Sequence, residues 1–242
     1  MPVTQKLSAQ ALSELAHYDT PTICNAIELF AIRPRTQGYM DTSIRSCFGE
    51  LAPMVGYALT ARFSAAPNSG GAKTGEVLYQ QSQQLQEMGG PGVIVFEDID
   101  RPTIAATFGE VMCTTYKTFG AVGLITSGAG RDLDQVQAIK FPVFTSSVNC
   151  SHGQCAVTEM NIAVEVGGVT IQPGDLLHGD RNGVTTIPHE IAGQIVDVCR
   201  RVAEAENIVM NYCRSASPTP KGMLEAYETL VRRVRKIQEE LA

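Results

Sequence analysis

The 242-residue sequence predicts a mixed α/β fold that has a parallel half and a hairpin half. Two strand–helix alternations follow one another between about residues 93 and 139, an order typical of parallel strands joined by helical crossovers. The chain then changes to short alternating runs with turn residues at Gly167–Gly168 and at 180–183, which predicts antiparallel hairpins. Two helices, at about 190–212 and 222–241, follow these hairpins.

The N-terminal elements begin with a helix over about 8–17. A second helix begins at Thr20, which we expect to cap it, with Pro21 at the first helical position, where a missing N–H costs nothing. A strand, a helix and a buried strand are expected at 56–65, 75–87 and 93–98.

The middle of the chain predicts a helix over 107–119, a strand over 121–126, a glycine-rich loop and a helix that begins at Asp132. A further strand covers 141–146. The last helix carries an apolar stripe, which we expect to pack on its own domain or on a neighbouring subunit. The stripe consists of Leu224, Tyr227, Leu230, Val231, Val234, Ile237 and Leu241.

The composition excludes several classes of protein. Hydrophobic residues make up 44% of the chain and charged residues 18%, so the chain can bury a core and is neither disordered nor a coiled coil. The formal net charge of −6 disfavours the broad basic face that nucleic acids require. No apolar run approaches the roughly 18 residues of a membrane span, and no signal-peptide core is present, so we expect a cytoplasmic protein of one domain over 1–242 with no membrane partner.

The seven cysteines are scattered and contain no CxxC pair, which indicates free thiols rather than disulfides or a structural metal site. Cys150, His152 and Cys155 form the one close cluster. Because a second pair of ligands is missing at zinc-site spacing, we interpret this segment as a loop.

The first candidate for chemistry is the segment from Phe108 to Met112. Gly109 stands at the start of a predicted helix, after a threonine that can cap it, so free N–H groups and the positive end of the helix dipole suit a carboxylate or phosphate. The glycine would allow a ligand close to the backbone. An ordinary helix start, with Glu110 favoured by the dipole, explains the same pattern equally well.

The second candidate is the loop from Ser127 to Asp132, which follows an apolar strand. Ligands of open α/β sheets bind beyond the carboxyl ends of strands. Arg131 offers a planar fork for carboxylate or enolate oxygens, and Asp132 offers the hard oxygen that Mg²⁺ or Mn²⁺ prefers. The alternative is an Asp that caps a helix beside a surface Arg.

The third candidate is the turn-rich segment 173–188. Its turn chemistry explains most of the pattern, and a lone histidine on a strand, His178, is more often structural than catalytic. The chain contains no GxSxG, no HExxH and no lysine placed for a Schiff base, which disfavours serine hydrolases, zincins and class I aldolases.

Three stretches resemble the signature of the RraA-like family: GEVMCTTYKTFGAVGLITSGAGRDLDQV, FPVF and VGGVTIQPGDLLHGDRNGVTTIP. The resemblance covers about Gly56 to Pro188. The family includes the 4-hydroxy-4-methyl-2-oxoglutarate / 4-carboxy-4-hydroxy-2-oxoadipate aldolases and the regulator of ribonuclease E activity. The resemblance implies an α-β-β-α swivelling fold with a core at about 20–190 and a helical extension over 190–242. It also implies a homotrimer or homohexamer whose active sites lie between subunits.

The resemblance also implies site residues. The backbone of Gly109, Glu110, Val111 and Met112 would hold a pyruvyl carboxylate. Arg131 would contact the carbonyl or enolate oxygen, and Asp132 would hold Mg²⁺ or Mn²⁺ partly through water. Glu110 stands where family aldolases carry an acid near these waters.

Other positions of the resemblance lie at the edge of the site. Glu206 is a candidate for an acid lent to a neighbouring subunit. Ser127, Asn25 and Gly130 depart from the family pattern, which often has Asp at the first two positions and a larger residue at the third. We expect residues 68–73 to line the pocket mouth, with Lys73 facing a distal carboxylate.

The function that follows is that of a class II, metal-dependent lyase. It would cleave a 4-hydroxy-2-oxo acid to release pyruvate, and it would decarboxylate oxaloacetate through the same enolate. The alternatives are a non-catalytic regulator that binds an RNA-degrading enzyme and a phosphohistidine carrier that uses His178 or His152.

Overall fold

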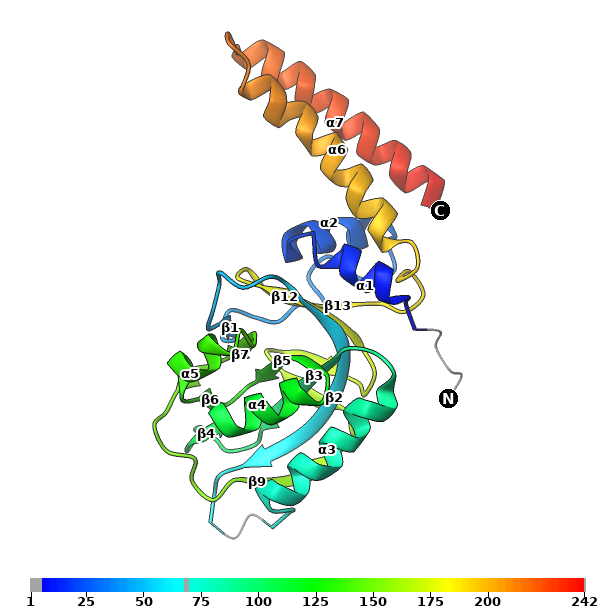
Figure 1. Ribbon diagram of the computed structural model, residues 1–242. Coiled ribbons are helices and arrows are strands. Elements are labelled where there is room, and N and C mark those ends of the chain that lie inside the picture. The colour runs from blue at the N-terminus through cyan, green and yellow to red at the C-terminus, as the bar shows by residue number, and fades with distance from the viewer. Residues whose placement is uncertain (1–5, 68–69, 242) are drawn as a thin grey trace.

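A computed structural model describes residues 6–67 and 70–241 of the chain (Figure 1). The helices are α1 (Ala9–Leu15), α2 (Thr20–Leu29), α3 (Thr74–Met88), α4 (Glu110–Thr118), α5 (Leu133–Ala138), α6 (Ile195–Cys213) and α7 (Pro220–Leu241). The strands are β1 (Arg45–Ser46), β2 (Met54–Ser64), β3 (Gly92–Asp98), β4 (Ala106–Phe108), β5 (Ala121–Thr126), β6 (Ala129–Gly130), β7 (Val143–Thr145), β8 (Ser147–Val148), β9 (Ala156–Met160), β10 (Val164–Val166), β11 (Val169–Ile171), β12 (Leu176–Asp180) and β13 (Gly183–Ile187).

The large sheet is mixed, as the sequence predicts, with the order β1-β7-β5-β3-β2-β12-β13. The strands β2, β3, β5 and β7 run parallel, whereas β12 and β13 form an antiparallel hairpin. The long strand β2 joins the two halves. The first part of one edge of β2 pairs with β12, and the later part of the same edge pairs with β9.

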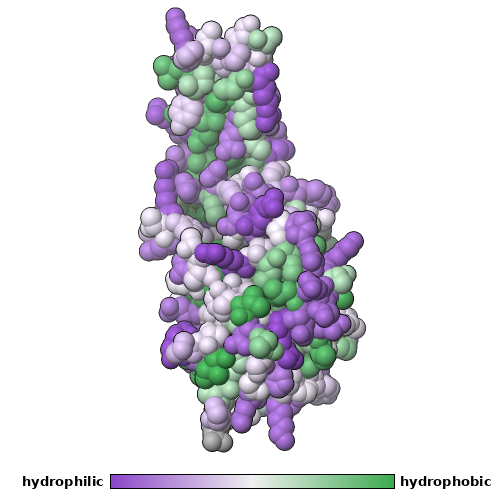
Figure 2. Space-filling view, turned by 90° about the vertical axis from the view of Figure 1, so that its left-hand side faces the viewer, coloured by the Kyte–Doolittle hydropathy of each residue, from purple (hydrophilic) through white to green (hydrophobic). Residues whose placement is uncertain are grey.

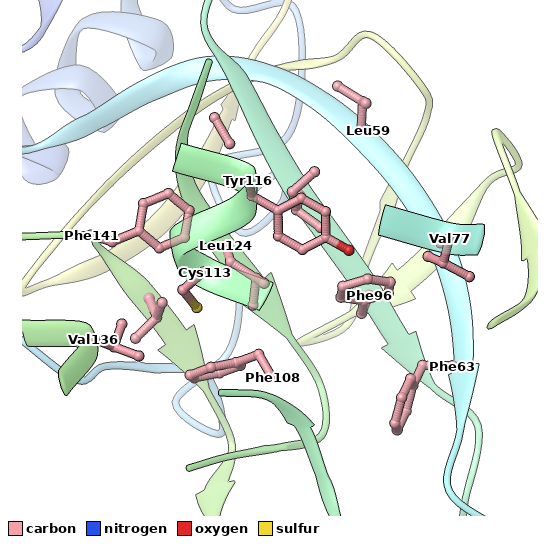
Figure 3. Close-up of a cluster of buried hydrophobic side chains, with 14 of the residues drawn as sticks. Leu59, Phe63, Val77, Phe96, Phe108, Cys113, Tyr116, Leu124, Val136 and Phe141 are labelled. Carbon is pink, nitrogen blue, oxygen red and sulfur yellow. The ribbon is translucent and has the colours of Figure 1, made fainter. Parts of the chain in front are cut away.

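Helices α3, α4 and α5 lie on the parallel half of the sheet and close a buried apolar cluster (Figures 1 and 3). Tyr116 of α4 and Phe108 of β4 are fully buried there beside Phe96 and Leu124 of the sheet. Burial of each such side chain contributes about 1.5–3 kcal/mol to folding. This cluster holds the start of α4 in place, and α4 begins directly after β4.

A second apolar cluster packs α1, α2 and α6 against the hairpin half of the sheet. The α6–α7 hairpin then projects from the body of the molecule (Figure 1). Only the C-terminal part of the predicted α7 stripe is covered, with Ile237 buried, and Leu224 and Tyr227 remain 53% and 52% exposed. Figure 2 shows hydrophobic residues gathered along this projecting hairpin.

Two helix starts differ from the prediction. Asp19, not Thr20, caps α2, and its Oδ1 accepts a hydrogen bond from the Thr22 N–H at 2.9 Å. The predicted helix over 107–119 begins only at Glu110, because residues 106–108 pair with β6 as a buried strand. Thr107 therefore does not cap α4, and its hydroxyl accepts a hydrogen bond from Thr126 at 3.1 Å.

Among the helices of the described residues, none combines the length and apolar character that a bilayer crossing requires.

Candidate functional site

The two sequence motifs that predicted a site are brought together by a short parallel pairing. β4 pairs with β6, with Phe108 opposite Gly130, and β6 pairs with β8. The Arg131 N–H continues this pairing and donates to the Phe108 carbonyl at 3.1 Å. Gly109 and the Arg131–Asp132 pair, each directly beyond its strand, therefore lie side by side.

Gly109 leaves space at this point for the side chains of Asp132 and Arg131. Its φ of −157° is extended backbone that any residue adopts. A Cβ at this position would lie 2.5 Å from Asp132 Oδ2 and 3.0 Å from Arg131 Nε, well inside van der Waals contact. Any side chain here would push both functional groups away from the start of α4.

Asp132 has a backbone in the left-handed region, with φ of 55°, which Asp tolerates better than most residues. It precedes α5 but does not cap that helix through its side chain. Its Oδ2 instead accepts a hydrogen bond from the Glu110 N–H at 3.0 Å. Asp132 therefore holds the N-cap position of α5, as the helix-cap interpretation has it, but its carboxylate is turned toward the start of α4 and does not cap α5.

The charges at this point are few and accessible. Arg131 Nε lies 3.7 Å from Asp132 Oδ2, and the two side chains are 34% and 36% exposed. No cluster of three or more His, Cys, Asp or Glu side chains that could hold a metal occurs within residues 6–67 and 70–241. One carboxylate suits Mg²⁺ or Mn²⁺, which complete their coordination with water and substrate oxygens, and does not suit a structural zinc ion.

A pocket of about 200 Å³ opens beside this pair. Its wall contains Gly109, Val111, Met112 and Arg131 from the predicted site. The remaining lining residues are Thr74, Ala106, Thr107, Phe108, His152 and Cys155. In the described part of the chain, the N–H groups of Val111 and Met112 have no hydrogen-bond partner, whereas the Glu110 N–H is taken by Asp132.

Sequence reasoning missed the contribution of the segment 149–155, which it interpreted only as a loop. The Asn149 N–H donates a hydrogen bond to the Gly130 carbonyl at 3.0 Å, and the Ser151 carbonyl accepts one from the Ala106 N–H at 2.7 Å. These bonds attach the loop to β6 and β4 and bring His152 and Cys155 to the pocket wall. The sequence signal that could have identified this segment was the close spacing of Cys150, His152 and Cys155, which matched no zinc pattern.

Cys155 is half-buried, and burial raises the pKa of its thiol, although the charge of Arg131 acts in the opposite direction. The thiol donates a hydrogen bond to the His152 carbonyl at 3.0 Å. It is therefore a neutral, bonded group in the pocket. All seven cysteines are free, as predicted.

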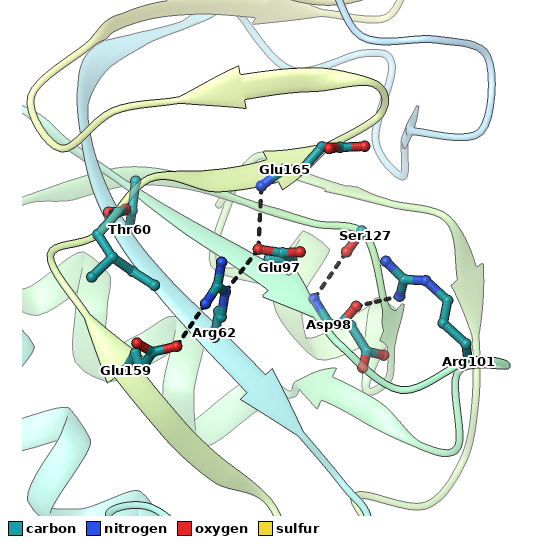
Figure 4. A network of polar contacts seen from close by, with 9 residues as sticks. Thr60, Arg62, Glu97, Asp98, Arg101, Ser127, Glu159 and Glu165 are labelled. Carbon is teal, nitrogen blue, oxygen red and sulfur yellow. Dashed lines mark hydrogen bonds and ion pairs between the residues drawn. The ribbon is translucent and has the colours of Figure 1, made fainter.

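The carboxyl end of β3 supports the loop that carries Arg131 (Figure 4). The Asp98 N–H donates to Ser127 Oγ at 2.9 Å, and the Arg101 guanidinium donates to the Asp98 carbonyl. Asp98 itself is fully buried, its Oδ2 has no partner among the described residues, and burial raises its carboxyl pKa. Gly128 passes so close that a Cβ there would lie 2.6 Å from this oxygen.

The three departures from the family pattern have structural counterparts. Ser127 bonds the end of β3 rather than lining the pocket. Gly130 is buried, and a Cβ there would overlap the Phe108 ring, so it does not form the pocket rim. Asn25 donates from Nδ2 to Glu206 Oε1 at 3.2 Å, which joins α2 to α6.

The remaining predicted residues lie elsewhere. Glu206 is on α6, outside the pocket wall of its own chain. Lys73 stands at the N-cap of α3, next to Thr74 of the pocket wall, while residues 68–69 of the expected mouth lie outside the described residues.

His178 is fully buried in β12 and has a structural environment. Its Nδ1 lies 3.0 Å from Thr20 Oγ1, and its Nε2 lies 3.2 Å from the Leu15 carbonyl oxygen. The carbonyl can only accept, so Nε2 carries the proton and Nδ1 accepts from Thr20. Burial lowers the pKa of this imidazole, which favours the neutral ring. This arrangement excludes His178 as a phosphohistidine.

Comparisons with known proteins concern the family and the fold of the chain. The family model "RraA-like", described as Aldolase/RraA, matches residues 20–186. A Halalkalibacterium halodurans protein, provisionally named 4-hydroxy-4-methyl-2-oxoglutarate aldolase, is 30% identical over 61% of this chain and 65% of its own length. An uncharacterized Methanocaldococcus jannaschii protein is 33% identical over 42% of this chain and 49% of its own length. The chain thus spans about half to two thirds of the length of these curated relatives.

Two solved structures share the fold. An uncharacterized protein from Pseudomonas syringae superposes with a TM-score of 0.72 at 21% identity, over 93% of this chain and 96% of its own. A Streptomyces coelicolor protein described as an unusual member of the RNase ES inhibitor RraA family superposes with a TM-score of 0.65 at 19% identity, over 84% and 96%. At these identities the likeness concerns the fold.

Proposed function

The chain belongs to the RraA-like family, and from this premise we propose that it is a divalent-metal-dependent lyase that releases pyruvate from a 4-hydroxy-2-oxo acid by retro-aldol cleavage. The same site would decarboxylate oxaloacetate as a side activity. The observation that carries the proposal is the placement of Arg131 and Asp132 against Gly109, at the edge of a pocket. The wall of this pocket includes Val111 and Met112, whose N–H groups have no partner among the described residues.

The start of α4 supplies the binding position for the substrate carboxylate. The N–H groups of Val111 and Met112 lie at the positive end of the helix dipole, and no described residue occupies them. A carboxylate bound there would place the adjacent 2-oxo group toward Arg131. This arrangement orients the substrate before any bond breaks.

Arg131 supplies fixed positive charge where negative charge develops. When the C3–C4 bond breaks, its electrons move onto the 2-oxo oxygen as an enolate, and a guanidinium remains charged and can donate hydrogen bonds to that oxygen. Oxaloacetate decarboxylation forms the same enolate, which explains why one pocket would serve both reactions.

Asp132 supplies the metal-binding carboxylate. Its Oδ1 accepts no hydrogen bond from the described residues, so this oxygen is available to Mg²⁺ or Mn²⁺ while Oδ2 is held by the Glu110 N–H. A divalent cation bound there would act as a Lewis acid toward the oxo-acid oxygens. The exposed Glu110 side chain is in the first turn of α4, and we propose that it would act on water retained by such a cation.

We further propose that active sites are shared between copies of this chain in a homotrimer or homohexamer. Glu206 lies on α6, outside its own pocket, so it would serve the pocket of a neighbouring copy. The uncovered part of the α7 stripe, with Leu224 and Tyr227, provides apolar area for such an assembly.

The test is pyruvate release from a 4-hydroxy-2-oxo diacid and from oxaloacetate, with Mg²⁺ and with a chelator. Arg131→Ala and Asp132→Ala are expected to lower both rates by about 10²–10³-fold, the usual loss for one electrostatic stabiliser. Asp134→Ala is the matched control, because Asp134 is an exposed carboxylate in the first turn of α5. Wild-type rates in the Arg131 and Asp132 variants would overturn the proposal.

The regulator alternative makes an opposite prediction for the same protein. A regulator would release no pyruvate with any metal and would bind an RNA-degrading enzyme without a chelator-sensitive step.

A further inference from the structure

Among the described residues that line the pocket, one side chain can both take up and return a proton. Of its ionisable groups, Arg131 never loses its proton, and the Cys155 thiol is kept neutral by burial and bonded to the His152 carbonyl. The remaining group is the imidazole of His152, which is exposed to the pocket. Histidine is the side chain most often used for general acid–base catalysis.

The hydrogen bonds of His152 define which ring nitrogen is free. Its Nδ1 lies 2.7 Å from the carbonyl oxygen of Gly153. A carbonyl oxygen can only accept, so Nδ1 carries the hydrogen and the neutral ring keeps its lone pair on Nε2. No described residue forms a hydrogen bond with Nε2. The ring therefore presents its basic nitrogen without a protein partner.

The backbone around His152 is anchored to the strands that carry the site. The Ser151 carbonyl is bonded to the Ala106 N–H of β4, and the Gln154 N–H donates to the Ala65 carbonyl at 3.2 Å. A Cβ at Gly153 would lie 2.9 Å from the Ala65 backbone, so the loop packs closely against that segment. His152 is thus held on the same framework as Phe108, Gly109 and Arg131.

We propose that His152 is a further catalytic residue of this site, and that its Nε2 is the general base and general acid of the retro-aldol reaction. This inference rests on the proposed function. His152 Nε2 removes the proton of the C4 hydroxyl while the C3–C4 bond breaks, the C4–O bond becomes a carbonyl, and the bond electrons form the pyruvate enolate. The imidazolium then returns the same proton to C3 of the enolate. One proton is moved from oxygen to carbon, and no oxidant or other reactant is needed.

One of the two reactions of the site needs a base and the other does not. Retro-aldol cleavage begins with the loss of a hydroxyl proton, so it needs a base. Oxaloacetate loses CO₂ from an ionised carboxylate, so its C–C bond breaks with no proton to remove, and the enolate that is left takes its proton from water. By microscopic reversibility, His152 also removes a C3 proton from bound pyruvate, and the methyl protons of pyruvate exchange with solvent.

The experiment compares wild-type protein with His152→Gln in three assays: aldol cleavage, oxaloacetate decarboxylation, and the exchange of pyruvate methyl protons in D₂O followed by NMR. We expect cleavage and exchange to fall together by about 10²–10⁴-fold, the usual contribution of a positioned acid–base group. Decarboxylation is expected to keep its wild-type rate. In His152→Ala, added imidazole is expected to restore part of the cleavage.

The controls exclude a structural effect. His17→Gln changes an exposed histidine at the end of α1, outside this pocket, and is expected to leave all three rates unchanged. Thermal unfolding of His152→Gln is expected to match the wild type, because the side chain is exposed.

Three results would overturn the assignment. Equal loss in all three assays would show a structural role, and a raised KM with wild-type kcat and exchange would show substrate binding only. If His152→Gln cleaves and exchanges at wild-type rates while Arg131→Ala loses both activities, the proposed function stands and His152 is not the base. A wild-type protein that releases no pyruvate from either substrate would reject the proposed function itself.

Discussion

Oδ2 of Asp132 accepts a hydrogen bond from the backbone N–H of Glu110 at 3.0 Å. The bond joins two segments that are 22 residues apart and that the sequence marked as separate candidates. It occupies one N–H group at the start of α4 and leaves those of Val111 and Met112 for a ligand. It also holds the carboxylate in one orientation, with its second oxygen available to a cation.

Replacement of Asp132 by Asn tests the charge of this group separately from its hydrogen bond. The amide oxygen can still accept from the Glu110 N–H, so the fold is expected to persist, whereas the loss of charge is expected to abolish the binding of Mn²⁺. Mn²⁺ binding is measured by the decrease of its free EPR signal. Asp134→Asn, which removes an exposed carboxylate on α5, is the control. Unchanged Mn²⁺ affinity in Asp132→Asn would show that the metal binds elsewhere.

Gly109→Ala tests the close approach of the two segments. The new Cβ would lie 2.5 Å from Asp132 Oδ2, so the carboxylate and Arg131 must move. These are partly exposed side chains that can swing away, so we expect the free energy of unfolding, measured by urea denaturation, to stay near the wild-type value while both pyruvate-forming activities are lost. Gly193→Ala, where a Cβ meets nothing within 4 Å, is expected to change neither quantity. Full activity in Gly109→Ala would contradict the geometry of the site.

The buried His178 predicts a dependence of stability on pH. Its pKa is lowered in the folded protein from the ordinary value of 6.5, so the unfolded chain binds more protons between these two values. The stabilising contribution is fully present above about pH 6.5 and is lost as the pH falls toward the folded pKa. The measurement is the free energy of unfolding from denaturant titrations between pH 5 and 8. In His178→Gln, the rise of the unfolding free energy with pH over this range is expected to disappear. An unchanged pH dependence would show that His178 is not its source.

Asp98→Asn tests the cost of burying a carboxylate whose Oδ2 has no partner among the described residues, under the 127–130 loop. Burial raises the pKa of Asp98, so ionisation of its carboxyl is less favourable in the folded protein, and stability falls as the pH rises from 3.8 through the folded pKa. An amide removes the charge, and the bond from the Asp98 N–H to Ser127 is retained. We expect a higher melting temperature for Asp98→Asn at pH 7 in differential scanning calorimetry. A lower melting temperature would show that an unseen partner stabilises the carboxylate.

A mixture of two inactive variants tests the sharing of sites between subunits. Asp132→Ala removes the carboxylate that we propose binds the metal in one pocket, and Glu206→Ala removes the acid on α6. If Glu206 serves a neighbouring pocket, mixed oligomers contain some pockets with both groups intact, so activity is expected to return when the variants are unfolded and refolded together. Separately refolded variants are the control. The absence of any recovery would confine Glu206 to a structural role with Asn25.

Local signals in the sequence were sufficient for most elements of the fold. The alternation of residues 56–65 predicted β2 (Met54–Ser64), and the glycine pair at 167–168 predicted the β10–β11 hairpin. The start of α4 was predicted too early in the chain, and the cause is non-local. Thr107 has the chemistry of a cap, but residues 106–108 pair with residues 129–130 and are buried as a strand.

The sequence by itself determined the α/β order of the elements, the Gly109 and Arg131–Asp132 motifs, and the resemblance that named their family. Those properties depend on short-range periodicity and on residue identity, which can be read along the chain. The tertiary structure alone decided that Asp132 bonds α4 rather than capping α5, that Glu206 lies outside its own pocket, and that His152 lies on the pocket wall. Each of these depends on pairings between segments more than 20 residues apart, and the register of such pairings is set by the packing of the whole core.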